Sequence, residues 1–333
     1  MRRDAVHSGN FAPVRAAGPM ARARMRAHHW RIFRRVLTVA FFAAVAWLLI
    51  EQARTIDWPA VFRSIRGYPL QSLALAAALA AASHVTYCGY DLIGRRYTGH
   101  QLPARSVAAV GFVSYAFNLN LGSLVGAFAL RYRLYARLGL TIGVTSRILA
   151  LSMLTNWLGY LCVAGTVCLL RPLQLPPNWR IGSAALPAIG AVALAVVAAY
   201  VVACFTARRR EWMVRGHRLI LPDGRIALVQ LAIASLNWTL IGSVVFVLLQ
   251  GRADYASAIS VLLVGAVAGL LAHIPAGLGV LEVVFVALLS QWVGQTDVLG
   301  AVLTYRALYY LAPLAIAIPL YLAIEARVAR GPG

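Results

Sequence analysis

The stretch Ala256–Ser290 decides the fold, because it is apolar except at its centre, which reads His273-Ile-Pro275-Ala-Gly277-Leu-Gly279-Val-Leu-Glu282. A proline and two glycines this close together interrupt a helix. The segments on either side, 250–256 and 291–297, carry few arginines or extra acids and therefore belong on the same side of the molecule. The stretch is predicted to run inward, turn at its centre and return as a broken helical hairpin.

A second stretch, 106–130, has the same design. Its middle reads Ala116-Phe-Asn118-Leu-Asn120-Leu-Gly122-Ser-Leu-Val-Gly126, and arginines stand at both of its ends. Two asparagines and two glycines are poorly tolerated in a helix that faces lipid, because broken backbone at membrane depth must be satisfied by protein or water. This stretch is predicted to be a second hairpin, entering from the opposite face.

Composition places both hairpins in a membrane protein. Of the 333 residues, 61% are hydrophobic and 12% are charged, whereas a soluble domain carries about 25% charged residues. A spanning helix needs about 20 apolar residues. We therefore expect an all-α, polytopic transmembrane helix bundle with two re-entrant hairpins and six full spans, namely Val36–Ile50 (as an uncleaved first span), Pro69–Tyr90, Ile148–Leu170, Ala184–Phe205, Ile226–Leu249 and Leu299–Ala323.

Arginine placement predicts the orientation. Basic loops favour the cytoplasmic side, which is where we place the N-terminal tail and the segments 91–105, 131–137 and 207–225. The expectation is a multi-pass protein of the bacterial inner membrane with both termini in the cytoplasm. Residues 1–30 are predicted to be a disordered basic tail and 31–327 a single transmembrane domain.

The two halves of this domain, about 69–170 and about 226–325, echo each other. In each, a hairpin is followed by a helix that bears an arginine, Arg147 in the first half and Arg306 in the second. This layout is typical of inverted-repeat transporters, whose binding sites lie near the midplane where helices are broken. The alternative is a chance similarity between two glycine-rich apolar segments.

Ionisable groups inside membrane segments are candidates for function. Glu282 leads, because it follows Gly277 and Gly279 and is predicted to lie in the first turn of a half-helix, where the helix dipole favours an anion. The alternative is a structural ion pair with Arg306 or Arg147. These two arginines could extend outward along their helices or converge on a phosphate, which suits their forked donors.

Other polar residues have weaker assignments. Asn118 and Asn120 could cap freed backbone groups or line a polar cavity. His273 and His84 are expected to have packing or hydrogen-bonding roles rather than to bind metal or relay protons. Arg131 and Arg133 are interpreted as plain cytoplasmic anchors.

Several classes of function are disfavoured. The four cysteines form no CxxC pair, and the chain contains no P-loop, dinucleotide fingerprint, HExxH or GxSxG. We expect no cofactor and no metal. The net charge of +21 comes from arginines at the ends of apolar runs, where they contact anionic head groups, so nucleic acid is not expected as a partner.

Several motifs carry a family resemblance: Tyr115-Ala-Phe-Asn118-Leu, Arg131-Tyr-Arg-Leu-Tyr135, Thr155-Asn-Trp-Leu-Gly-Tyr160, the segment His273–Glu282 and Tyr305-Arg-Ala-Leu-Tyr-Tyr310. From about residue 29 onward the chain resembles the YbhN family of inner-membrane proteins. It also resembles the wider family of the transmembrane, flippase-like region of lysylphosphatidylglycerol synthases. The stretch Pro275–Glu282 and Arg306 match that family's signature positions. The resemblance implies a lipid-handling protein. No soluble aminoacyl-transferase domain follows before Gly333, so lysyl transfer is not expected.

The leading hypothesis is therefore a phospholipid translocase that acts on an anionic membrane lipid. The head group would enter between the hairpins, with Arg147 or Arg306 on the phosphate, while Glu282 pairs or exchanges a proton. The alternatives are an intramembrane lipid-modifying transferase with Glu282 or His273 as base, a small-solute or ion transporter, and an accessory partner of a lipid-synthesis enzyme.

Overall fold

The computed structural model describes residues 58–173, 182–208, 210–214, 217–272, 277–290 and 292–329, together with a few isolated positions between 40 and 54. The chain divides into two units, 1–53 and 54–333, and the second contains all the helices and strands from α2 to α12. The expected first span, Val36–Ile50, lies almost wholly outside the described residues.

The fold is an all-α membrane bundle, as predicted. Within the described ranges, six helices are long and apolar enough to cross a membrane: α3 (Leu70–Thr98), α6 (Ile142–Leu170), α7 with the 3-10 turn before it (Ser183–Thr206), α8 (Gly224–Leu248), α9 (Tyr255–Ala272) and the continuous helix that starts at Gln295. Five of them coincide with expected spans. The sixth, α9, was expected as the first arm of the second hairpin.

The first hairpin breaks where the sequence indicated. Helix α4 (Ala104–Leu121) ends at Gly122, whose φ of 82° and ψ of 171° suit glycine alone. The chain then turns back as a π-helical segment, η1 (Leu124–Leu130), which continues into α5 (Arg131–Arg137). Gly126 allows the close return, because a Cβ atom there would overlap the backbone of Asn118.

The second hairpin is formed by α9 and α10 (Val280–Leu289). Gly277 and Gly279 have φ of 56° and 77°, so the chain reaches α10 through left-handed backbone. The arms are in close contact, since a Cβ atom on Gly265 would lie 2.9 Å from the side chain of Leu281. A helix of ten residues is only about 15 Å long, so α10 is too short to cross a bilayer. The inverted relation of the two hairpins stays a prediction.

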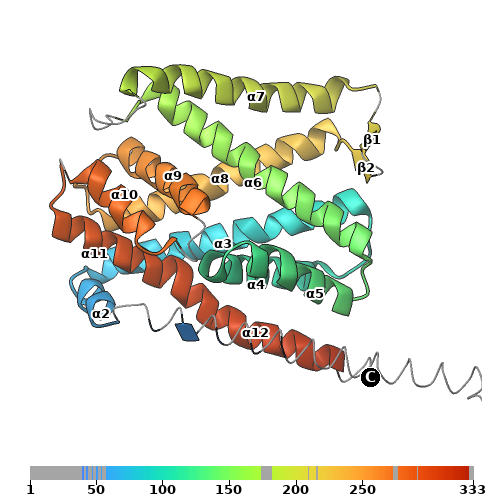
Figure 1. Ribbon diagram of the computed structural model, residues 1–333, viewed down its shortest axis with the longest axis horizontal. Coiled ribbons are helices and arrows are strands. Elements are labelled where there is room, and N and C mark those ends of the chain that lie inside the picture. Colours follow the sequence, from blue (N-terminus) through green and yellow to red (C-terminus); the bar gives the residue numbers. More distant parts are fainter. Residues whose placement is uncertain are drawn as a thin grey trace, which may run out of the picture. The chain divides into compact units, whose positions relative to one another are not determined.

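The remaining elements frame these hairpins. Helix α11 (Gln295–Arg306) passes through a π-helical segment, η4 (Ala307–Leu311), into α12 (Ala312–Ala329). Figure 1 shows this long helix at one edge of the bundle and α7 at the opposite edge. Helix α3 packs along α8, α4 and α6, and so occupies the centre.

Two short elements complete the unit. Helix α2 (Trp58–Arg66) lies against α11, because the Ser64 hydroxyl donates to the carbonyl of Gly300 at 2.7 Å. The connection after α7 contains an antiparallel hairpin of two strands, β1 (Glu211–Val214) and β2 (His217–Ile220).

The close return at Gly126 gives a first prediction. Gly126→Ala should lower the free energy of unfolding by about 3 kcal/mol, the upper end of the range for overpacking, because the neighbouring atoms are backbone and cannot rotate away. Gly143→Ala is the matched control, since a Cβ atom at this position of α6 would meet no other atom within 4 Å. Unfolding of the purified protein in mixed detergent micelles measures both. Equal stability of the two variants would contradict the tight turn.

Candidate functional site

A cavity of about 530 Å³ lies between the bends of the two hairpins. Hairpin one contributes Asn118, Gly122 and Leu124, and hairpin two contributes Gly265, Gly269, Leu270, Gly277 and Leu281. A cluster of aromatic side chains from α4, α8, α11 and η4 completes the lining: Tyr115, Trp238, Tyr305, Tyr309 and Tyr310. Among the described residues, none that lines this cavity is charged. The broken helices therefore form the walls of one mostly apolar chamber.

Glu282 and Arg306 form an ion pair next to this cavity, since their chain neighbours Leu281 and Tyr305 line it. The Nε and Nη2 atoms of Arg306 donate to the two carboxylate oxygens of Glu282 at 2.7 and 3.0 Å, and Nη2 also donates to the carbonyl of Gly277 at 2.8 Å. Glu282 lies in the first turn of α10, as the sequence suggested. Of the two roles that the sequence left open for Glu282, this geometry matches the structural ion pair with Arg306.

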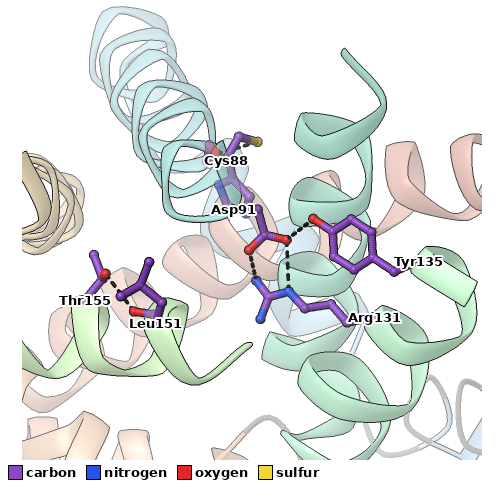
Figure 2. A network of polar contacts seen from close by, with 7 residues as sticks. Cys88, Asp91, Arg131, Tyr135, Leu151 and Thr155 are labelled. Atoms are coloured by element: carbon purple, nitrogen blue, oxygen red, sulfur yellow. Dashed lines mark hydrogen bonds and ion pairs between the residues drawn. The ribbon is translucent and has the colours of Figure 1, made fainter. Parts of the chain in front are cut away.

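Hairpin one has an ion pair of its own, between Asp91 on α3 and Arg131 at the start of α5 (Figure 2). The Nη2 and Nε atoms of Arg131 lie 3.0 and 3.2 Å from the two carboxylate oxygens, and the Tyr135 hydroxyl donates to Asp91 at 2.8 Å. The side chains of Arg131 and Asp91 are 1% and 0% exposed. A buried charge is tolerated because a partner and hydrogen bonds compensate for its lost hydration.

This second pair corrects the sequence interpretation. Asp91 was expected in a cytoplasmic loop, but α3 continues to Thr98 and buries it. Arg131 and Arg133 were interpreted as plain anchors, whereas Arg131 is fully buried and the Nε atom of Arg133 lies 2.6 Å from Glu325 on α12. A signal was present in the sequence: His84, Tyr87 and Asp91 follow one another at intervals that place them on one helix face.

The two asparagines of hairpin one have different surroundings. Asn120 is buried, and its amide donates to the carbonyl of Ala116 at 2.8 Å and to that of Tyr310 at 3.1 Å. It thereby satisfies a carbonyl of the π-helical segment η4 and holds hairpin one against it. Asn118 is half-buried and lines the cavity. The sequence offered both roles, capping and cavity lining, and the structure gives one to each residue.

Two other candidates, Arg147 and Gly279, are not among the residues that line this cavity. Arg147 is exposed, and its Nε donates at 3.3 Å to the carbonyl of Gly143 in its own helix, so it does not join Arg306. Gly279 forms the start of α10. His273 and Pro275 lie outside the described residues. In the part of the chain that the structure describes, no three His, Cys, Asp or Glu side chains are grouped to hold a metal ion.

Comparison with known proteins agrees with this architecture. The model of the lysylphosphatidylglycerol synthase TM region matches residues 35–317. The chain belongs to this family. It is 41% identical to the inner membrane protein YbhN of Escherichia coli K12 over 299 residues, which cover 90% of this chain and 94% of that protein. It is also 31% identical to an uncharacterized protein of Synechocystis over 260 residues, 77% of this chain and 80% of that protein. The chain is therefore a multi-pass membrane protein of this family.

The burial of the ion pairs predicts a graded effect on stability. Asp91→Asn should lower the free energy of unfolding by about 3 to 5 kcal/mol, because it leaves Arg131 buried without a counter-charge. Glu282→Gln should lower the free energy of unfolding by less, about 2 kcal/mol, because Glu282 is 20% exposed and this pair is therefore less fully removed from solvent than the first. Asp297→Asn is the control, since its pair with Arg252 is nearly half-exposed and such pairs contribute at most about 1 kcal/mol.

Unfolding of the three variants in mixed micelles measures these differences. Equal losses for all three would show that burial does not set the contribution of these pairs.

Proposed function

We propose that this protein is a phospholipid translocase of the bacterial inner membrane, with both termini in the cytoplasm. The observation that supports the proposal is the cavity between the two hairpin bends. Its volume of about 530 Å³ lies within the range of about 300 to 1,000 Å³ that is typical of ligand sites. Transporters with inverted repeats bind their substrates at such broken helices.

The lining suggests how a phospholipid would lie in it. At the edge of the cavity, Leu124 is 80% exposed and Leu270 is 50% exposed, one on each hairpin. In a membrane-spanning bundle, exposed leucines face acyl chains rather than water. The lining also includes Asn118 and the tyrosines Tyr115, Tyr305, Tyr309 and Tyr310. A head group would occupy the cavity, while the acyl chains would extend between the two leucines into the bilayer.

The proposal does not include the contacts between an arginine and the lipid phosphate that the sequence suggested. We expected Arg147 or Arg306 on the lipid phosphate. Arg147 is exposed on α6 away from the cavity, and Arg306 donates to Glu282 and to Gly277. In the described conformation Glu282 accepts two hydrogen bonds from Arg306, which makes it a positioning residue for the second hairpin. The proposal therefore assigns Asn118 and Ser123, which line the cavity, as donors to the phosphate.

Filling the cavity tests the proposal. Gly269→Leu places a side chain in the lining, and its Cβ atom meets no heavy atom closer than 3.9 Å, so the fold should survive. In proteoliposomes, transfer of a fluorescent phospholipid between leaflets is measured by its exposure to an impermeant reductant. We expect transfer by the natural protein and at least about a tenfold loss in Gly269→Leu, because a side chain of this size competes directly with the ligand.

Gly143→Leu is the matched control, because no atom lies within 4 Å of its Cβ position and it is outside the cavity lining. It should transfer lipid at the natural rate. If the wild-type protein transfers no phospholipid between the leaflets, the proposal is refuted. A new lipid species on overexpression would point to a transferase, solute uptake to a solute transporter, and co-purification with a lipid-synthesis enzyme to an accessory role.

A further inference from the structure

A chain of hydrogen bonds leads from the middle of the bundle to the cavity wall. The Ser83 hydroxyl donates to the amide oxygen of Asn237 at 2.7 Å. The Tyr309 hydroxyl lies 2.7 Å from the Ser83 oxygen, and the Tyr115 hydroxyl lies 2.9 Å from that of Tyr309. All four residues are buried, and of these Tyr115 and Tyr309 line the cavity.

The direction of each donor in this chain follows from the first bond. A hydroxyl has one proton to donate, and that of Ser83 goes to Asn237. Tyr309 must therefore donate to Ser83, and Tyr115 must donate to Tyr309. The proton of Tyr115 is thus already used, so toward a ligand in the cavity that Tyr115 lines, its oxygen can act only as an acceptor.

His84 packs against the same two tyrosines. Its ring lies 5.1 Å from that of Tyr115 and 4.8 Å from that of Tyr309. Nδ1 is 2.9 Å from the carbonyl of Ala80, which can only accept, so in the neutral ring the proton is on Nδ1 and Nε2 is an acceptor. No donor among the described residues reaches Nε2.

The aromatic rings of this wall add a second element of recognition. Tyr305 and Tyr309 stack at 5.3 Å, and Tyr310 lies 6.0 Å from Tyr309. The faces of such rings attract cations, and Arg306 already lies 5.8 Å from the ring of Tyr310, on the ion-pair side. A lining that combines tyrosine rings with an acceptor oxygen suits a ligand that is a cation and also donates hydrogen bonds.

We infer that the cavity selects phospholipids with a primary ammonium head group, of the ethanolamine class. This inference rests on the proposed function. It replaces the anionic lipid that the sequence analysis expected as the substrate on the basis of Arg147 and Arg306. The ammonium would donate to the Tyr115 oxygen and contact the aromatic rings. A choline head group lacks N–H donors, and a glycerol head group lacks the cation, so neither satisfies both elements of the wall.

Equilibrium binding tests this inference without requiring transport. The natural protein in detergent is titrated with fluorescent phosphatidylethanolamine, phosphatidylcholine and phosphatidylglycerol that carry the same acyl chains. We expect phosphatidylethanolamine to bind about tenfold more tightly than either of the others, which corresponds to one hydrogen bond from a charged donor. Soluble phosphoethanolamine should bind much more weakly, because it has no acyl chains to contact the apolar lining.

Two variants separate a hydrogen-bonding role from a structural one. Tyr115→Phe keeps the ring but removes the acceptor, and should reduce the preference for phosphatidylethanolamine severalfold. Tyr309→Phe removes the group that accepts from Tyr115, so the Tyr115 hydroxyl becomes free to donate and phosphatidylglycerol should bind more tightly. Tyr200→Phe is the control: its hydroxyl donates to Gln230 at 2.9 Å and the residue does not line the cavity.

The outcomes are distinct. Phosphatidylcholine or phosphatidylglycerol binding as tightly as phosphatidylethanolamine would overturn the inference and leave the proposed translocase intact. An unchanged preference in Tyr115→Phe would also overturn it, as would phosphoethanolamine binding as tightly as the lipid. If none of the three lipids binds, both the inference and the proposed function fail.

Discussion

The structure depends on one constraint, which is that charges and broken backbone within the hydrocarbon must find their partners inside the protein. Each hairpin is joined to an ion pair between an acid and an arginine. In hairpin one, Arg131 follows the returning arm and pairs with Asp91 on the central helix α3. In hairpin two, Glu282 begins the returning arm and pairs with Arg306, which also binds the carbonyl of Gly277 at the break. These pairs help to position both hairpins.

The two pairs lie at opposite ends of one aromatic cluster. Arg131 lies 5.9 Å from the ring of Tyr87, which stacks on Tyr115 at 3.6 Å. The Tyr115 hydroxyl is hydrogen-bonded to Tyr309, and the neighbouring Tyr310 faces Arg306. The cavity is thus bounded by a continuous set of side chains that links one hairpin anchor to the other.

The π-helical segments have a related role. η1 follows the break in hairpin one, and η4 connects α11 to α12 beside the cavity. A π-helix widens the turn and is often found at functional sites. Here it leaves the carbonyl of Tyr310 accessible to the Asn120 amide, which joins the first hairpin to the C-terminal helix. Four residues before Asn120, Ala116 also accepts a hydrogen bond from the same amide.

The sequence alone determined the membrane class, five of the spans and both breaks, because these depend on local properties: the length of apolar runs and the backbone demands of glycine and proline. It also singled out Glu282 and Arg306, since charges within apolar runs are conspicuous. Only the tertiary structure decided that Arg306 pairs with Glu282 while Arg147 stays exposed, and that Asp91 is buried with Arg131. It also decided that the described residues of the cavity wall include five aromatic side chains and no charged one. These outcomes depend on which helix faces meet, and the spacing of residues along one helix carries no information about the face of its partner.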